Sequence, residues 1–470
     1  MPPYRVRFAP QQIYQSPVSQ EVTTSHPAKP SRTRTRSGCR RCRERRVKCD
    51  ETFPVCRACS RRGDVCQPAL PASQWQPEVW CVVTVTPGLD PSRKLLPHPE
   101  VNSRLLRYWF ECMCQIMTID PESNPMSFPI LQHLSASKSL VYIIQCISAA
   151  HEKYFQPTQM TVSLEERSKA LRVLRGELRS DKLHPGLGFL VVLILGMSSS
   201  WITTEPDDFG REHLMAAHIA VDMALKCPKA ADDELVHLAT GFFVYWDMAC
   251  SFCLDPDDHP PPYRPRLENY VKMASSRFHT IVSHSIDLYY LLGKVGRYCR
   301  TVADGFQRDL VQEMCFEAEL NTYMSIEQDP SACQLTEAFR LHGLVMLYRL
   351  CGRPGHHAVE IDHVAEGGTF SVRSLALRIL DLLFQIPLSS PYVNLHTIPL
   401  ISAGAELGAE DADLRERVIQ QLRAIYSTNR IPPTLSVIEL LQELWNVQDC
   451  GFTMTWLELM LIKKWRLRIG

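Results

Sequence analysis

Residues 39–66 read CRRCRERRVKCDETFPVCRACSRRGDVC, and this stretch decides how the 470-residue chain is organised. Its six cysteines follow the pattern C-x2-C-x6-C-x6-C-x2-C-x6-C. Moving the first three cysteines along by 17 residues superimposes them on the last three. The motif is therefore a tandem of two half-sites with the same spacing, and it is the strongest functional signal in the sequence.

The cysteine spacing predicts a metal site. The start of the chain, MPPYRVRFAPQQ, lacks the apolar segment of a secretory signal. Regular cysteines without a secretory route indicate metal binding, whereas the alternatives are three disulfides or a redox-active C-x-x-C pair. The doubled spacing favours Zn²⁺, which takes four thiolates in a tetrahedron. The predicted ligands are Cys39, Cys42, Cys49, Cys56, Cys59 and Cys66.

Six cysteines are enough for two zinc ions only if two sulfurs are shared, because two tetrahedral sites need eight ligand positions. Cys39 and Cys56 are the first cysteines of the two halves and are therefore equivalent, so we predict that they bridge the ions. Structural zinc contributes on the order of 10 kcal/mol of folding free energy per site. This explains how so short a segment folds without a large apolar core.

Positive charge is concentrated around the cysteines. Residues 30–66 contain 12 Lys/Arg and 4 Asp/Glu, a net charge of +8, and the rest of the chain has 39 basic and 47 acidic residues, a net charge of −8. A basic island on an acidic body indicates a polyanionic partner for the island. The candidate DNA-contacting residues are Arg40, Arg41, Arg43, Arg45, Arg46 and Lys48.

The first half-site is the better candidate for docking into nucleic acid, because these six basic residues lie within it. Arginine contacts guanine O6 and N7 in the major groove, and Arg or Lys pairs with phosphate. Spacing alone leaves the base and phosphate roles open. We expect the helix after Cys39 to end before Cys49, and Gly63 to end the second helix. The alternative is a zinc-stabilised module for RNA or protein, although Phe53 is the motif's one aromatic residue for base stacking.

The stretch SGCRRCRERRVKCDETFPVCRACSRRGDVC, residues 37–66, resembles the fungal Zn2Cys6 binuclear-cluster transcription factors. It matches them in all six cysteines, in the basic run before the third cysteine, and in Pro54 between the third and fourth. The resemblance implies two zinc ions and a DNA-binding regulator in the nucleus.

The same resemblance implies roles for individual basic residues. Arg45 and Arg46 fall where the family has its base-reading pair, and Arg43 and Lys48 fall among its phosphate or groove contacts. The partner that it implies is double-stranded DNA with GC-containing, CGG-like triplets. Many members carry Lys where this chain has Arg46.

Composition divides the chain into four parts. Residues 1–31 show no hydrophobic period and are predicted to be disordered. Residues 32–68 form the cluster domain, and residues 69–100 form a linker within a stretch, 67–100, that holds seven prolines. No sustained heptad follows the cluster, so a homodimer is left open. Residues 101–470 are predicted to be a large all-α domain.

Apolar residues at helical spacing indicate helices throughout this body. Ser163-x-x-Glu166 and Ser436-x-x-Glu439 suggest capping boxes at helix starts. Residues 183–202 contain no Asp, Glu, Lys or Arg, but prolines and glycines interrupt them, so we predict a buried helix rather than a membrane span. The remaining cysteine pairs are predicted to be core residues, namely Cys112 with Cys114 and Cys250 with Cys253.

The body also resembles the fungal-specific transcription factor domain, a helical regulatory module. The stretches that carry this resemblance are LLRYWF (105–110), LVYIIQCISAAHEKYF (140–155), IPLISAGAE (398–406) and, at a distance, Trp445. The resemblance implies a small-molecule effector or a coregulator as a partner of this body. No Walker A, G-x-G-x-x-G or G-x-S-x-G motif occurs, so the sequence does not support an enzyme.

These observations predict a nuclear, zinc-dependent, sequence-specific regulator of RNA polymerase II genes, with nutrient use or secondary metabolism as candidate pathways. The arginines of RTRTRSG, residues 32–38, suggest a nuclear import signal; the alternative is that they only contact DNA phosphate, and one cluster can serve both roles.

Overall fold

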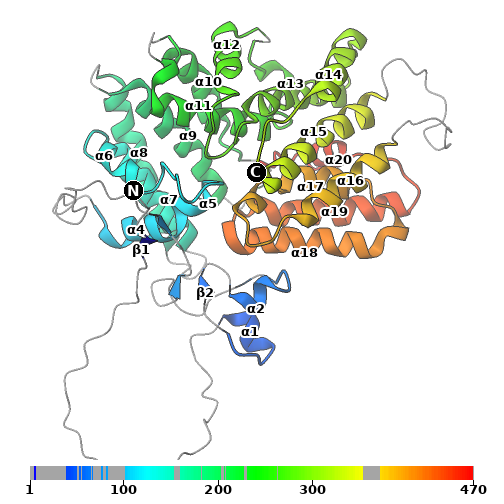
Figure 1. Ribbon diagram of the computed structural model, residues 1–470, viewed down its shortest axis with the longest axis horizontal. Coiled ribbons are helices and arrows are strands. Elements are labelled where there is room, and N and C mark those ends of the chain that lie inside the picture. The colour runs from blue at the N-terminus through cyan, green and yellow to red at the C-terminus, as the bar shows by residue number, and fades with distance from the viewer. Residues whose placement is uncertain are drawn as a thin grey trace, which may run out of the picture.

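The computed structural model has two parts, a small cysteine-rich domain and a large helical body (Figure 1). It describes residues 5–6, 39–49, 52–53, 56–64, 66, 76–77, 81–82, 101–152, 159–180, 183–202, 206, 208–226, 230–261, 263–352 and 371–468. The predicted import signal and most of the predicted linker lie outside these residues. The disorder predicted for residues 1–31 stays a prediction, since only Arg5–Val6 are described there.

Two short helices and two pairs of short strands form the N-terminal part. The helices are α1 (Arg40–Glu44) and α2 (Arg57–Ser60). The strands are β1 (Arg5–Val6), β2 (Thr52–Phe53), β3 (Gln76–Pro77) and β4 (Cys81–Val82). β1 pairs with β4 in antiparallel orientation, and β2 pairs with β3 in parallel orientation.

The first part of the body is a series of helices that includes the central apolar helix α9. They are α4 (Ser103–Tyr108), the π-helix η2 (Trp109–Met113), α5 (Cys114–Ile116), η3 (Phe128–Ile130), α6 (Leu131–Leu134), α7 (Lys138–Glu152), α8 (Gln159–Leu178), α9 (Pro185–Ile202) and α10 (Arg211–Ala224). α9 packs against α7, α8, α10 and α11 (Glu234–Ala249). Because all of its faces meet protein, α9 is apolar all round rather than amphipathic.

Burial explains the composition of α9. It is long and apolar enough to cross a membrane, but 83% of its residues are buried within the body. Gly196 permits the close packing of α9 on α11, because a Cβ at this position would lie 2.1 Å from the Trp246 ring. The prediction of a buried helix at residues 183–202 is confirmed.

The chain then continues through further helices to its C-terminal end. They are η4 (Ala230–Asp232), η5 (Pro256–Asp258), α12 (Pro265–Ala274), α13 (Ile286–Ala303), α14 (Leu310–Thr322), α15 (Pro330–Cys351), α16 (Val372–Gln385), η6 (Pro391–Leu395), α17 (Thr397–Gly404), η7 (Ala409–Asp411), α18 (Ala412–Asn429), α19 (Pro433–Asp449) and α20 (Trp456–Ile462). Figure 1 shows α4–α8 on one side, α16–α20 on the other, and α9–α15 joining them. The all-α fold predicted for the body is therefore confirmed.

The two predicted capping boxes are wrong. Ser163 and Glu166 lie inside α8, where the Ser163 hydroxyl donates to the Cys146 carbonyl and Glu166 accepts from Gln145. Ser436 likewise lies inside α19. These polar side chains make contacts within and between helices. The spacing Ser-x-x-Glu is the same inside a helix as at a helix start, so the motif alone does not identify a cap. A capping box does open α20, at Thr455 and Glu458.

Candidate metal centre and nucleic-acid interface

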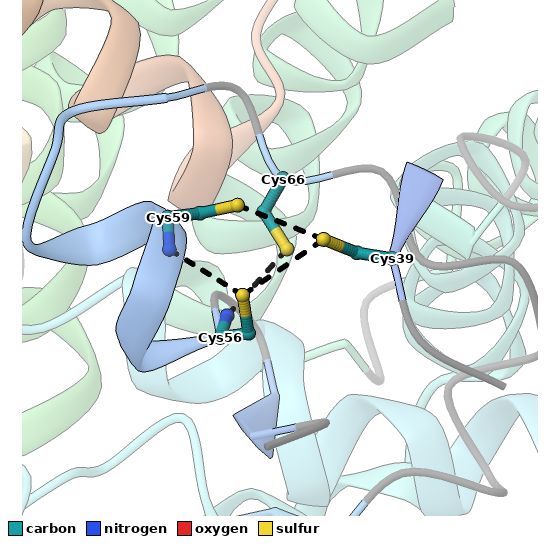
Figure 2. A group of neighbouring side chains, drawn as sticks. All are labelled: Cys39, Cys56, Cys59 and Cys66. Atoms are coloured by element: carbon teal, nitrogen blue, oxygen red, sulfur yellow. Dashed lines mark hydrogen bonds between the residues drawn. The ribbon is translucent and has the colours of Figure 1, made fainter. Parts of the chain in front are cut away.

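The six cysteine sulfurs come together in two groups of four. One group is Cys39, Cys42, Cys49 and Cys56, and the other is Cys39, Cys56, Cys59 and Cys66, with all ligand atoms of each group within 4.8 Å of one another. Figure 2 shows the second group, with its four sulfur atoms pointing toward a common centre. Cys39 and Cys56, the two residues predicted to bridge, are the members that both groups share.

The sulfur separations suit zinc. The Sγ atoms of Cys39 lie 3.8 Å from Cys56 and 3.6 Å from Cys59, and Cys42 lies 3.6 Å from Cys56. A tetrahedron with Zn–S bonds of about 2.3 Å has edges of about 3.8 Å. All six side chains are buried, so an ion among them would be shielded from water.

The two short helices place the paired cysteines in the same way. The Cys39 sulfur caps α1 by accepting from the Cys42 amide at 3.3 Å, and the Cys56 sulfur caps α2 by accepting from the Cys59 amide at 3.4 Å. Each bond satisfies an amide at a helix start and favours the charged form of the sulfur. The spacing C-x2-C therefore serves helix capping and metal binding together.

Zinc has to displace protons in this cluster. Burial raises the pKa of the Cys42 thiol to about 12, and the neighbouring cysteines contribute to the shift. A thiol of this kind is neutral at pH 7 without a cation, whereas the ligand is the thiolate. The energy of the zinc–sulfur bonds therefore supports both ionisation and folding of the cluster.

Both cluster helices end in the same backbone motif. After α1, the Val47 amide bonds the Cys42 carbonyl at 3.0 Å, and after α2 the Asp64 amide bonds the Cys59 carbonyl at 3.1 Å. The residues in between, Arg46 and Gly63, have positive φ angles of 56° and 63°. This is the arrangement of a Schellman helix end. The predicted stop at Gly63 and the predicted break before Cys49 are confirmed.

The predicted DNA-contacting residues divide into two sets. Arg40, Arg43, Arg46 and Lys48 are exposed. In the described part of the chain, the last three make no ion pair, whereas Arg40 pairs with Glu44 on its own helix at 2.9 Å. The other two, Arg41 and Arg45, form ion pairs with Asp64 of the second half-site; Arg45 is half-buried, whereas Arg41 is exposed and also pairs with Glu44 at 3.5 Å.

Asp64 connects the two half-sites through these arginines. Its carboxylate lies 2.8 Å from Arg45 Nη1 and 3.5 Å from Arg41 Nε. The Arg45 and Asp64 side chains are only 22% and 21% exposed, so their ion pair is partly shielded from solvent. The spacing of the motif predicted no role for Asp64. The available signal was its position as the single acid among the basic residues between Cys56 and Cys66.

The body contributes no second metal site among the described residues. Cys112, Cys114, Cys250 and Cys253 are buried, and burial raises the pKa of Cys253 to about 12, which makes these thiols core residues as predicted. Two of the stretches that carry the resemblance also meet, because Trp445 Nε1 donates to the Gly404 carbonyl at 2.8 Å.

A pair of four-cysteine groups beside a basic helix, joined to an all-helical body, defines a zinc-stabilised DNA-binding regulator. Residues 37–76 match the Fungal Zn(2)-Cys(6) binuclear cluster domain, and residues 104–469 match the Fungal specific transcription factor domain. Since the second match covers most of the chain, the protein belongs to the family of fungal Zn(2)-Cys(6) transcription factors. Its cofactor is accordingly a pair of zinc ions held by the six cysteines.

Curated relatives are similar to the chain over short segments. The chain is 56% identical over 41 residues to the Zn(2)-C6 fungal-type transcription factor afumD of Aspergillus fumigatus, covering 9% of this chain and 11% of the relative. It is 49% identical over 39 residues to the transcriptional regulatory protein moc3 of Schizosaccharomyces pombe (8% of each protein). It is 44% identical over 55 residues to the aspercryptin biosynthesis cluster-specific transcription regulator atnN of Emericella nidulans (12% of this chain, 9% of the relative).

These matches span about a tenth of each relative's length. No solved structure matches the chain significantly. The family and its named relatives confirm the predicted resemblance, the cofactor and DNA-binding transcription regulation, and they indicate a regulator rather than an enzyme.

Proposed function

We propose that the protein is a nuclear regulator of RNA polymerase II transcription that reads a short GC-containing, CGG-like element through α1 and the residues after it. The observation that carries the proposal is the exposed basic surface of Arg40, Arg43, Arg46 and Lys48 beside the buried cysteine cluster. Arginine and lysine on a short, metal-fixed helix suit contacts with guanine edges and phosphate in the major groove.

In this proposal the basic residues have separate roles. Arg46 is the strongest candidate for reading a base, because it is exposed and its backbone conformation is one that glycine adopts more easily. Arg40, Arg43 and Lys48 contact phosphate or the groove. Arg41 and Arg45 hold the reading helix to the second half-site through Asp64. The family resemblance implies that Arg45 reads a base, whereas in this proposal Arg45 positions the reading helix instead.

Two zinc ions sharing Cys39 and Cys56 support this arrangement, since both four-cysteine groups contain these residues. Zinc supplies structure here, and the chain's own arginines supply recognition. A pathway-specific role in secondary metabolism is supported by the similarity to atnN, a cluster-specific regulator of aspercryptin biosynthesis.

An effector or coregulator acting on the helical body is part of the same proposal. A pocket of about 210 Å³ near the start of α4 is one candidate site for a small molecule. It is lined by Ser103, Arg104, Arg107, Tyr108, Glu111 and Glu152, so a ligand with both acidic and basic groups would suit it.

Selection of bound sequences from a random pool of double-stranded DNA tests the DNA-reading proposal. We expect a CGG-like triplet to be enriched by the zinc-loaded chain and not by a Cys59→Ala variant. A single triplet would indicate a monomer, and two triplets at fixed spacing a dimer. Preference for single-stranded RNA over duplex DNA in competition would overturn the proposal and favour the RNA-binding alternative.

A further inference from the structure

The second half-site of the cluster domain contacts helix α18 of the body. The Ser427 hydroxyl donates to the Asp64 carbonyl at 2.9 Å and accepts from the Cys66 amide at 3.2 Å. The same oxygen lies 2.9 Å from the Arg423 carbonyl, one turn earlier in its own helix. Ser427 is completely buried. A single side chain of the body therefore bonds two backbone groups of the cluster, one of them on a zinc ligand.

Gly63 lies directly against the same helix. A Cβ at this residue would be 2.8 Å from the Gln420 backbone oxygen and 3.3 Å from the Gln420 Cβ. Contacts this short leave no room for a side chain. Gln420 and Ser427 are seven residues apart, two helical turns, so they lie on one face of α18. The end of α2 thus rests on a strip of α18 two turns long.

This contact leaves the basic helix uncovered. Figure 1 shows α1 on the side of α2 that faces away from α18. Arg40, Arg43 and Arg46 remain exposed while Gly63 and Cys66 are buried. Docking to α18 is therefore compatible with an accessible reading surface.

The strip on α18 is itself fixed to the centre of the body. The Thr428 carbonyl lies 3.3 Å from His151 Nε2 on α7, and the Asn429 carbonyl accepts from Trp201 Nε1 on α9 at 2.9 Å. Both contacts follow Ser427 within one turn. The cluster domain is thereby linked to buried helices of the body and not only through the proline-rich segment.

We propose that the face of α18 from Gln420 to Ser427 is an internal docking surface for the second half-site of the cluster domain. The body thereby sets the orientation in which α1 is presented. This docking contact does not involve the proposed DNA element. It can therefore be tested independently of the proposed DNA-reading function.

Hydrogen–deuterium exchange on the full-length, zinc-loaded chain tests the dock. Ser427→Ala removes the acceptor for the Cys66 amide, and we expect the peptide containing Cys66 to exchange at least tenfold faster. Thr428→Ala is the matched control, because among the residues that the structure describes the Thr428 hydroxyl bonds only the Ala424 carbonyl of its own helix. Both variants should retain two zinc ions per chain.

A second variant changes the cluster side. Asn tolerates a positive φ better than most residues, so Gly63→Asn should keep the helix end but collide with α18. Gly451→Asn is the control, since Gly451 also has a positive φ and has open space beside it. We expect zinc loading to raise the melting temperature of the helical body in the wild type and the Gly451 variant but not in Gly63→Asn.

Two outcomes would overturn the dock. One is a Cys66 exchange rate that is the same in the wild type and in Ser427→Ala while zinc content stays at two. The other is a zinc-dependent melting shift that persists in Gly63→Asn. If Gly63→Asn fails to bind zinc, the exchange measurement on Ser427→Ala decides alone, because Ser427 lies outside the cluster.

Discussion

Arg46 and Gly63 lie 17 residues apart at the same position of the two half-sites, and both have a left-handed backbone, with φ of 56° and 63°. The position follows a helix end in each half, where glycine is the usual residue. Gly63 faces α18 and leaves no room for a side chain, whereas Arg46 is exposed. The repeat therefore conserves the backbone shape, while one half uses the position for packing and the other presents a cation.

Arg46→Gly separates the strain at this position from its function. A non-glycine residue in the left-handed region costs about 1 kcal/mol. The variant should therefore keep both zinc ions and be as stable as the wild type or more stable by up to about 1 kcal/mol. Its affinity for the selected DNA element should fall roughly tenfold to hundredfold, corresponding to about 1–3 kcal/mol. Zinc content and DNA titration measure the two effects.

Arg62→Ala is the charge-matched control for this experiment, because Arg62 is exposed and lies in the second half-site. It should change affinity far less. Equal losses on all DNA sequences in Arg46→Gly would make Arg46 a phosphate contact instead of a base reader.

Zinc stoichiometry distinguishes the bridging cysteines from the others. Cys39→Ala removes a ligand from both four-cysteine groups and should weaken both zinc sites. Cys49→Ala removes a ligand from one group and should leave one ion tightly bound. Cys250→Ala, a buried core thiol, should keep two ions per chain. Metal analysis after mild chelation gives the counts, and identical losses in Cys39→Ala and Cys49→Ala would contradict the bridge.

A buried ion pair stabilises the centre of the body. Although burial alone raises the pKa of Asp247, Arg297 at 2.9 Å and His218 at 3.1 Å hold that pKa below its usual value. Asp247→Asn leaves the mostly buried Arg297 guanidinium without its anionic partner and should cost roughly 3–5 kcal/mol of unfolding free energy. Asp381→Asn, in an exposed pair with Arg378, should cost less than about 1 kcal/mol. Denaturant titration compares them, and similar losses would count against the role of Asp247.

Acid should destabilise the body through three buried histidines. Burial lowers the pKa of His279, His342 and His396 to about 3. The unfolded chain binds protons at these residues below about pH 6.5, and the folded chain does so only near pH 3. Their contribution to stability is therefore complete above pH 6.5 and is lost as the pH falls toward 3. Each histidine should account for about 1.4 kcal/mol per pH unit in this window.

His342→Gln tests the histidine contribution. Glutamine does not titrate, and its side chain retains a hydrogen-bonding group for Ser402, the partner of His342 at 2.7 Å. The slope of unfolding free energy against pH between 6.5 and 4 should decrease by about 1.4 kcal/mol per pH unit. An unchanged slope would show that His342 does not titrate on unfolding.

Several features were predictable because their causes are local in the sequence. The cysteine spacing predicted two metal groups that share Cys39 and Cys56, since ligand geometry within short loops constrains the chain directly. The helix end at Gly63 followed from glycine's tolerance of a positive φ. Residues 183–202 were predictable as a buried helix rather than a membrane span because prolines and glycines interrupt their uncharged sequence. The proposed capping boxes failed because Ser163 and Ser436 lie inside helices, at positions that only their tertiary neighbours explain.

The sequence by itself determined the metal, the number of cysteine ligands, the basic first half-site and the helical body, because each depends on residue chemistry repeated at short spacing. Only the tertiary structure decided that Arg45 turns inward to Asp64 and that Ser427 meets Asp64 and Cys66 from more than 350 residues away. Such contacts depend on how distant surfaces meet after folding. No local pattern in the sequence records that complementarity, whereas the folded chain brings the two surfaces together.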